Sequence, residues 1–437
     1  MNKPEKPKLP KFSVSPPRGM RDILPEEARI RDFAIFKILE TYRKYGFGRV
    51  ETPALENISL LLNSESGENE KLIFKVLKRG EKLELSSETK QIDDLVDLGL
   101  RFDLTVPLVR YYAANRHELP KVFKSLQIGP VWRAERPQRG RFRQFTQCDI
   151  DIIGVESELA EIELLLATSE ALNQLGFKQF VIRFNDRRIL TKWVEQCGFL
   201  PEQFDNVFII LDKLDKIGVE GVRDELENHG YVKTTVANIF ENISGFLAAN
   251  GDFSIIKSNL PTEVEEGLYQ AVERVIHTVR SQAAGRYTIV FDPTLVRGMS
   301  YYTGPIFEVE YRDYPFSIAG GGRYDRMVGK LTGVETPACG FSIGFERIIT
   351  ILREEAFAVE TALERLVILI TPQDALADVF AVMNDFQSRG LATSIFYQKK
   401  KLKKQLNDLA MEGYQHFCLF KADEPQQTVE ILESQQE

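Results

Sequence analysis

Residues 124–154 carry the side chains of this sequence that are best suited to chemistry. The second half of the stretch, QFTQCDIDII, is predicted to be a strand, so successive side chains point to opposite faces. One face would carry two acids and an amide beside a ring, from Phe145, Gln147, Asp149 and Asp151. The other face would point toward a core, with Thr146, Cys148, Ile150 and Ile152.

An arginine-rich loop joins this strand to the one before it. Arg133 and Glu135 share a face at the end of the earlier strand, and the loop adds four arginines, Arg136, Arg139, Arg141 and Arg143. Arginines beside an acid-lined floor suit a ligand that is anionic at one end and cationic or hydrogen-bond-donating at the other. The alternative is a solvated hairpin with a charged tip, because short motifs carry false positives.

Three further segments offer polar groups on predicted strands or turns. They contain Arg101, Asp103 and Thr105 on one strand face, Arg297 near the Tyr301–Tyr302 pair, and Arg347 after a strand. None of these segments contains a histidine, so a Ser/His/Asp or Cys/His nucleophile is not expected. Arginines without a protein nucleophile fit phosphoryl or nucleotidyl transfer, where positioning and charge stabilisation dominate. A substrate carboxylate, ionised at neutral pH, could attack phosphorus without a general base.

Composition bounds the class of protein. A chain of 437 residues with 43% hydrophobic and 27% charged residues is expected to form two or three globular domains. A net charge of -8 argues against nucleic-acid binding over the whole surface but allows a local basic patch. The four cysteines and four histidines are scattered, which predicts a reducing compartment and no protein-built metal site. Without a signal-like or bilayer-length apolar run, a cytoplasmic protein is expected.

The order of predicted elements gives an α/β (α+β) chain in several parts. We expect a disordered tail over 1–15, a two-part catalytic domain over 16–187 and 286–355, a helical insertion over 188–285, a linker over 356–365 and a small α/β domain over 366–437. The last domain carries a lysine run, either a nucleic-acid contact or a solvated helix face, at Lys399, Lys400, Lys401, Lys403 and Lys404. A helix from Pro25 could equally be core or dimer interface.

Several of these stretches together resemble one family. FKSLQIGPVWRAERPQRGRFRQFTQCDIDIIG is similar to motif 2 of class II aminoacyl-tRNA synthetases in its histidyl form, and ACGFSIGFERI is similar to motif 3. LVRGMSYYTGPIFE and AGGGRYD resemble the two stretches peculiar to histidyl-tRNA synthetases, RGMRDILPEE through VETPALE resembles motif 1, and RFDLTVP resembles the amino-acid-binding strand. The resemblance runs from Arg18 to Ala422 and implies a class II antiparallel sheet flanked by helices, with an anticodon-binding-type C-terminal domain.

The resemblance also implies roles for individual residues. Histidine would be bound by Asp103, Thr105, Gln147, Asp151, Tyr301 and Tyr302, with Asp151 and Tyr302 reading the imidazole. ATP would be bound by Arg133, Glu135, Arg141, Phe145 and Arg347, with Phe145 and Arg347 on the two faces of adenine. Arg297 and Arg133 would be the catalytic arginines, and Arg136 and Gln138 would meet the acceptor end of the tRNA.

The implied activity is ATP-dependent activation of L-histidine to histidyl-adenylate, followed by transfer to the 3′ end of tRNA(His). ATP would arrive with Mg²⁺, and the family is a homodimer through motif 1, with no membrane partner. The alternative is a paralog that binds histidine as a regulatory subunit of histidine biosynthesis without charging tRNA. That relative typically lacks the C-terminal domain and the ATP-contacting arginines, both of which this sequence has. Thr146 and Ser300 depart from the family's usual residues, and the C-terminus is short.

Overall fold

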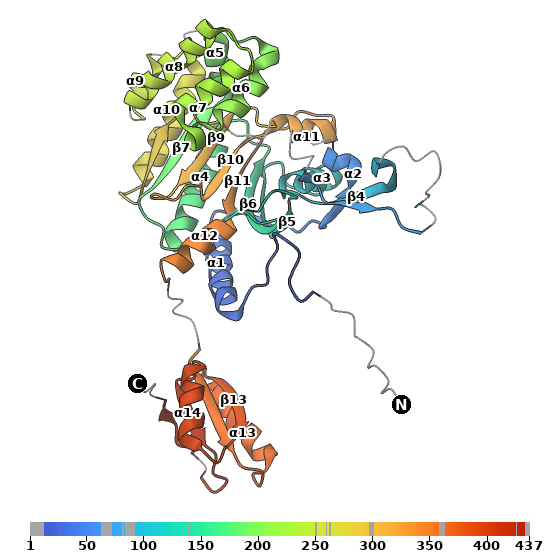
Figure 1. The fold of residues 1–437 in the computed structure, drawn as a ribbon, viewed down its shortest axis with the longest axis vertical. Coiled ribbons are helices and arrows are strands. Elements are labelled where there is room, and N and C mark those ends of the chain that lie inside the picture. The colour runs from blue at the N-terminus through green and yellow to red at the C-terminus, as the bar shows by residue number, and fades with distance from the viewer. Residues whose placement is uncertain are drawn as a thin grey trace, which may run out of the picture. The chain divides into compact units, whose positions relative to one another are not determined.

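The computed structural model describes residues 13–62, 72–80, 83, 92–137, 140–249, 251–258, 260–261, 264–296, 301–357, 363–424 and 426–432. The chain divides into two compact units, Met1–Phe357 and Ala358–Glu437 (Figure 1). Of the residues predicted to be functional, Arg297 and Gln138 lie outside the described ranges. No helix in those ranges is both long and apolar enough to cross a membrane.

An eight-stranded sheet forms the centre of the first unit, in the order β1-β5-β6-β11-β10-β9-β7-β8. The strands are β1 (Gly48–Arg49), β5 (Phe123–Trp132), β6 (Gln144–Ile153), β7 (Phe180–Asp186), β8 (Tyr287–Phe291), β9 (Pro305–Glu310), β10 (Ala319–Arg323) and β11 (Ala338–Gly344). Neighbouring strands are antiparallel except β1 with β5 and β7 with β8. The predicted antiparallel sheet flanked by helices is confirmed.

Helices cover one face of this sheet and bury the main core. They are α1 (Pro25–Lys44), α4 (Leu159–Gln174), α10 (Glu266–Gln282) and α12 (Phe345–Glu354). Cys148, Ile150 and Ile152 of β6 point into this core, as their alternation predicted. Helix α1 begins at Pro25 because proline is tolerated at the first helical position, and Glu26 and Glu27 place negative charge at the positive end of the helix dipole.

A second, three-stranded sheet in the order β2-β4-β3 lies beside the eight-stranded sheet, on the side of β5. Its strands are β2 (Leu55–Asn57), β3 (Lys75–Leu77) and β4 (Val96–Leu100). The neighbouring helices are α2 (Ile58–Leu62), η3 (Ile92–Leu95), α3 (Thr105–Asn115) and α11 (Asp325–Thr332). The expectation that Arg101, Asp103 and Thr105 share a strand face was wrong, because β4 ends at Leu100 and Thr105 begins α3. Asp103 stops the strand by accepting the backbone N–H of Val106 at 3.1 Å, which starts the helix.

Arg101 also differs from its predicted place. Its guanidinium donates to the carbonyls of Thr52 (2.7 Å) and Pro130 (2.9 Å), and the side chain is buried. Arg101 therefore ties the chain before β2 to the end of β5 and does not face a ligand.

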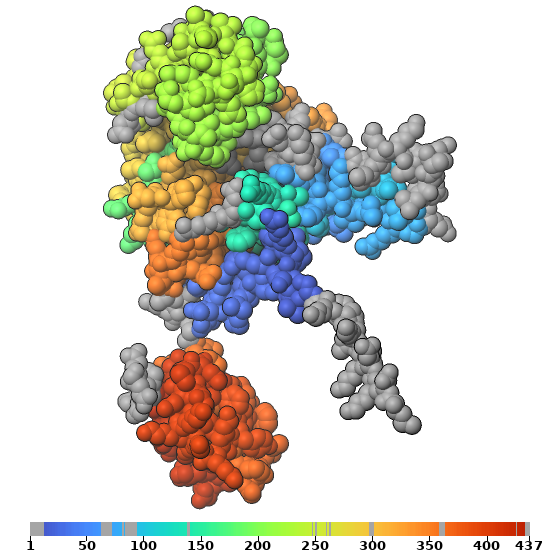
Figure 2. Space-filling view, in the orientation of Figure 1, coloured from blue at the N-terminus to red at the C-terminus, as the bar shows by residue number. Residues whose placement is uncertain are grey.

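The described residues between β7 and β8 form helices and turns. They are α5 (Arg187–Gln196), η4 (Pro201–Gln203), α6 (Phe204–Leu211), α7 (Leu214–Asn228), α8 (Lys233–Ala248), α9 (Phe253–Lys257) and α10. Figure 2 shows the residues of α5 to α8, in green and yellow-green, gathered at one end of the first unit. Asp186 caps α5 by accepting the N–H of Arg188 at 2.9 Å.

The second unit alternates strands and helices, as predicted. It contains β12 (Arg365–Ile370), α13 (Leu376–Ser388), β13 (Ala392–Tyr397), α14 (Leu402–Met411), β14 (His416–Leu419) and β15 (Glu430–Ile431). β12 pairs in parallel with β13 and β14, and β15 closes the edge of β14 antiparallel. Alternate residues of β12 enter two small cores, one under α13 and one under α14.

A buried ion pair joins β10 of the eight-stranded sheet to α4 and gives a test of the fold. Arg323 donates to Glu161 at 2.7 and 2.9 Å, and Glu161 is 0% exposed. Glu161→Ala should lower the free energy of unfolding by roughly 3–5 kcal/mol, because the guanidinium is left buried without its carboxylate. The measurement is urea unfolding.

Glu170→Ala on the same helix is the matched control. Its pair with Arg286, at 2.9 Å, is partly exposed, so its loss should change stability by at most about 1 kcal/mol. Equal effects of the two substitutions would contradict the assigned importance of the Arg323–Glu161 pair.

Candidate active site

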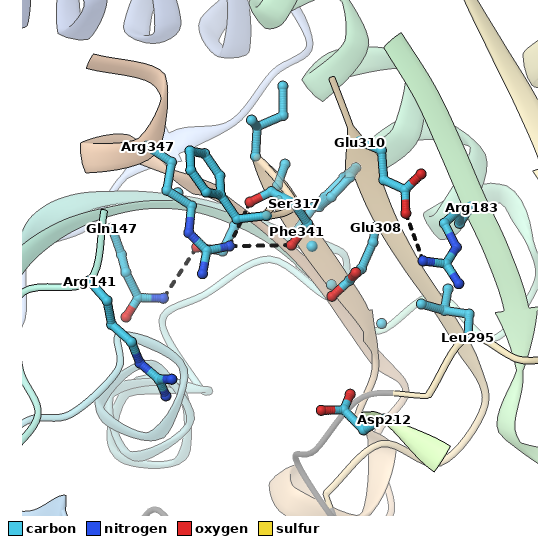
Figure 3. Close-up of a pocket in the computed structure, with 18 of the residues that line it drawn as sticks. Arg141, Gln147, Arg183, Asp212, Leu295, Glu308, Glu310, Ser317, Phe341 and Arg347 are labelled. Atoms are coloured by element: carbon cyan, nitrogen blue, oxygen red, sulfur yellow. Dashed lines mark hydrogen bonds and ion pairs between the residues drawn. The ribbon is translucent and has the colours of Figure 1, made fainter. Parts of the chain in front are cut away.

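A cavity of about 760 Å³ lies over the polar face of the central sheet. Its lining includes all eleven described residues that the sequence assigned to histidine or ATP, namely Asp103, Thr105, Arg133, Glu135, Arg141, Phe145, Gln147, Asp151, Tyr301, Tyr302 and Arg347. In Figure 3, Arg141, Gln147 and Arg347 lie toward one end, while Arg183, Glu308 and Glu310 lie toward the other. Arg136 is exposed and does not line the cavity.

Glycines keep the floor of the cavity open. Gly340 of β11 lies opposite Asp151 of β6, and a Cβ on Gly340 would stand 2.1 Å from the Asp151 carboxylate. On β10, a Cβ on Gly322 would stand 2.8 Å from the ring of Tyr302. Only glycine leaves room there for the functional side chains of the neighbouring segments.

Three hydrogen-bond acceptors in the cavity have no partner among the described residues. They are Asp103 Oδ2, Asp151 Oδ2 and Gln147 Oε1. Both carboxyl groups are about 2% exposed. Buried acceptors are normally paired, so their convergence in one cavity indicates a ligand that brings hydrogen-bond donors or positive charge.

Tyr324 is a site residue that the sequence reasoning did not assign. Its hydroxyl donates to Asp151 Oδ1 at 2.7 Å, and Tyr324 is itself buried. The expected companion of Asp151 was Tyr302, which lines the same cavity. Tyr324 follows the last residue of β10, so strand alternation gave no indication of its direction; its place in AGGGRYD was the only available signal.

Asp149, between Gln147 and Asp151 in β6, is a second cavity residue to which the sequence reasoning gave no role. Its carboxyl accepts the Ser342 hydroxyl at 2.5 Å and the Gln147 amide at 3.4 Å. Burial, with the nearby charge of Asp151, raises the pKa of Asp149 well above its ordinary value. This contact directs the Gln147 amide nitrogen toward Asp149 and leaves the amide oxygen for a ligand.

The other two acids are also shifted by their surroundings. Burial raises the pKa of Asp103 to about 6, although the Val106 N–H opposes that shift. Burial raises the pKa of Asp151 to about 7, opposed by the Tyr324 hydroxyl and reinforced by the charge of Asp103. Perturbed carboxyls that share one cavity are typical of functional sites.

The arginine end of the cavity is organised around Phe145 and Glu135. Arg133 donates to the Phe102 carbonyl at 2.9 Å and its guanidinium lies 5.1 Å from the centre of the Phe145 ring. Arg141 pairs with Glu135, with one N–O distance of 2.6 Å, while about half of the Arg141 side chain stays exposed. One guanidinium group therefore lies over an aromatic face and a second lines the same cavity, an arrangement that suits an aromatic, anionic ligand.

Arg347 completes this end from the opposite side. Its guanidinium donates to the Ser317 carbonyl at 2.6 Å and lies 5.4 Å from the centre of the Phe316 ring. Gly140, with a φ of +70°, brings the loop after β5 against Phe316 and Arg347. The far end of the cavity is closed by Arg183, which pairs with Asp215, Asp292 and Glu310, each at 2.6 Å.

The described ranges hold no group of three or more His, Cys, Asp or Glu side chains placed to bind a metal ion. All four cysteines are buried and free.

The fold is that of the catalytic domain of a class II aminoacyl-tRNA synthetase. A structure of histidyl-tRNA synthetase from Nostoc sp. PCC 7120 superposes with a TM-score of 0.75 at 26% identity, covering 96% of this chain and 97% of that one. The chain is 42% identical over 94% of its length to a histidine–tRNA ligase of Leifsonia xyli subsp. xyli, of which it covers 96%. It is 33% identical over 92% of its length to one of Cytophaga hutchinsonii, of which it covers 90%.

A structure described as an ATP phosphoribosyltransferase regulatory subunit/histidyl-tRNA synthetase, from Bacillus halodurans C, shares the fold with a TM-score of 0.75 at 21% identity, covering 94% of this chain and all of that one. The histidyl-tRNA synthetase family model matches residues 19–348. The chain belongs to the histidyl-tRNA synthetase family.

The raised pKa of Asp151 predicts a pH-dependent stability effect. An acid with a folded-state pKa of about 7 contributes stability that is present below its unfolded pKa of about 4 and is lost as the pH rises through 7. Asp151→Asn removes that loss. Relative to the parent, the variant should therefore gain up to roughly 4 kcal/mol in unfolding free energy between pH 4 and pH 8.

Urea unfolding of both proteins across this pH range measures the effect. Asp224→Asn, at an exposed position of α7, serves as the control and should show no such pH-dependent gain. A constant difference between Asp151→Asn and the parent would show that Asp151 is ionised as easily in the fold as outside it.

Proposed function

We propose that this protein activates L-histidine with ATP to form histidyl-adenylate and transfers the histidyl group to the 3′ end of tRNA(His). The observation that carries the proposal is one cavity that combines arginines and an aromatic ring with three buried acceptors that have no partner among the described residues. Histidine supplies an ammonium group and a ring N–H to the acceptors, and ATP supplies the anionic, aromatic partner.

The amino-acid end selects histidine by pairing its donors. Asp103, Thr105 and Gln147 hold the α-ammonium group, and Asp151 accepts the ring N–H while Tyr301 and Tyr302 border the ring. Tyr324 keeps one oxygen of Asp151 occupied, so the other is directed at the ligand. An amino acid without a ring donor would leave that oxygen buried and unpaired, which is the basis of rejection.

The arginine end positions ATP for attack. Phe145 and Arg347 sandwich adenine, Glu135 accepts from the adenine amino group, Arg133 binds the α-phosphate and Arg141 the outer phosphates. Arg141 pairs with Glu135 in this structure, and nucleotide binding supplies each with a new partner. Mg²⁺ arrives with ATP as part of the substrate.

The first step is an in-line displacement. A carboxylate oxygen of histidine forms a bond to the α-phosphorus, the bond from that phosphorus to the bridging oxygen breaks, and pyrophosphate leaves. Arg133 and Arg297 stabilise the charge on the reacting phosphoryl group. In the second step the terminal tRNA hydroxyl attacks the histidyl carbonyl and AMP leaves.

The tRNA meets two parts of the chain. Arg136 and Gln138 contact the acceptor end, since Arg136 is exposed just outside the cavity. In the second unit, exposed Phe396 and Tyr397 lie at the end of edge strand β13, directly before the run of lysines. Aromatic faces beside positive charge suit unpaired RNA bases, which supports anticodon binding by residues 366–437.

The enzyme is proposed to be a cytoplasmic homodimer that pairs through α1 and the strand after it. Leu24, which directly precedes that helix, is 71% exposed in the single chain, and Phe36, within the helix, is 62% exposed. Exposed large apolar groups on one element support an interface there. Four free cysteines agree with a reducing compartment.

Histidine-dependent ATP–pyrophosphate exchange tests the activity and its residues together. The parent should exchange, and Arg133→Ala should lose at least ~100-fold because one preorganised donor at the reacting phosphate is gone. Arg136→Ala, in the same loop, should keep parental exchange while charging tRNA poorly. A histidine-binding regulatory subunit would show histidine binding without any exchange, which would refute the proposed function.

Removal of the second unit tests the division of labour. A chain ending at Glu364 keeps every residue assigned to adenylation, so its exchange rate should stay within about threefold of the parent. Its charging of tRNA(His) should fall by at least ~10-fold, because the aromatic and lysine contacts are lost. Equal charging by both chains would show that the second unit is dispensable for tRNA.

A further inference from the structure

Glu346, the second residue of α12, is a buried carboxylate that gathers donors from two other segments. Arg31 of α1 donates to it at 2.8 and 2.9 Å, and Arg21 donates at 3.2 Å. The backbone N–H of Thr146, in β6, donates to the same carboxylate at 3.2 Å. Arg31 also donates to the Thr146 hydroxyl at 3.1 Å. Arg31, Glu346 and Thr146 therefore form a closed set of contacts, one of them through the Thr146 backbone, which we call the Arg31 node.

The position of the Arg31 node relates it to the nucleotide end of the cavity. Thr146 directly follows Phe145, and Glu346 directly precedes Arg347. Successive strand residues point to opposite faces, so Phe145 faces the cavity while Thr146 faces the node. The node therefore joins the two backbone segments that carry the residues proposed to sandwich adenine.

Further charged and aromatic contacts surround the node. Glu27, also buried, accepts from Arg21 at 2.7 Å and from Arg353 at 2.8 Å. Burial alone would raise the pKa of Glu27, but its arginine partners hold that pKa below the ordinary value. Arg31 itself lies 3.8 Å from Glu27, and its guanidinium lies 4.8 Å from the centre of the Phe345 ring. Arg31 therefore has ionic, hydrogen-bonding and aromatic contacts at once.

We propose that Arg31 is a positioning residue for the nucleotide: through Glu346 and Thr146 it sets the separation of Phe145 and Arg347, and so the affinity for ATP. The inference rests on the proposed function of the cavity. It also gives Thr146, a departure from the family pattern, a specific role as the acceptor for Arg31. A small shift of either segment would loosen both stacking faces, because stacking needs contact on each side of the ring.

The test compares Arg31→Lys and Thr146→Val with the parent. Lysine keeps the positive charge but lacks the planar fork by which Arg31 bonds both oxygens of Glu346 and also reaches Thr146. Valine keeps the volume of Thr146 without an acceptor. Arg31→Lys should raise the KM for ATP about 10-fold, and Thr146→Val about 3-fold. The KM for histidine should stay within about twofold, since the acids of the amino-acid end are bound through other residues. Arg29→Lys, at an exposed position of the same helix, is the matched control and should change neither constant.

Direct binding of a non-hydrolysable ATP analogue, measured by calorimetry, gives a readout that does not need turnover. Arg31→Lys should weaken that binding about 10-fold while thermal unfolding shows a folded protein. An unchanged ATP affinity, or equal losses for ATP and histidine, would overturn the positioning role and leave the node as a structural contact. A parent that binds the analogue without exchange would refute the proposed function while the binding comparison still decides the role of Arg31. A parent that does not bind the analogue would refute both.

Discussion

The first unit depends on a strip of small residues at the centre of its main sheet. On the cavity face, β11 places Gly340, Ser342 and Gly344 opposite Asp151, Asp149 and Gln147 of β6. The next strand, β10, places Gly322 and Gly320 opposite Gly340 and Ser342. The same register directs Cys148, Ile150 and Ile152 to the helices on the other face. A shift of one residue would exchange the two sets, so burial of the core and construction of the cavity fix the pairing together. The close approach at Gly340 and Asp151 leaves no alternative residue at that position.

The buried acids of the cavity lower the stability of the fold. Asp103, Asp149 and Asp151 are all buried, and each has a pKa above its ordinary value. Buried acceptors without partners lower stability, so the rest of the unit must compensate through its large apolar core. A ligand that brings an ammonium group and a ring N–H reverses the sign of these contributions. In the proposed function, these same atoms provide the free energy that discriminates among amino acids.

Local patterns in the sequence predict an α/β chain with polar strand faces, and the family resemblance supplies the antiparallel class II sheet and the roles of individual residues. The alternation in QFTQCDIDII correctly assigned its acids to the cavity and its aliphatic residues to the core, because period-two alternation depends only on neighbours. The pattern failed at RFDLT, where a contact from the Asp103 side chain to the backbone ends the strand.

Tyr324 and the Arg31 node could not be predicted, since they depend on contacts between distant segments. Arg31 and Glu346, for example, are 315 positions apart. Arg297 and Gln138, which fall outside the described ranges, remain predictions.

The arginine end of the cavity is the part that separates an activating enzyme from a histidine-binding subunit. In the proposed function, binding of histidine alone would need only the acids, Gln147 and the tyrosines around them. Arg133, Arg141 and Arg347 add three guanidinium groups at the other end, each directed by a specific contact with Phe102, Glu135 or Ser317. Ordering long cationic side chains around an aromatic face lowers stability unless a ligand uses them, because side-chain entropy is lost. Phe145 offers no anion to these guanidinium groups, whereas the phosphates of a nucleotide would pair with them. In the proposed function, one sheet face therefore carries the complementary ends that would bring a carboxylate and a phosphate together.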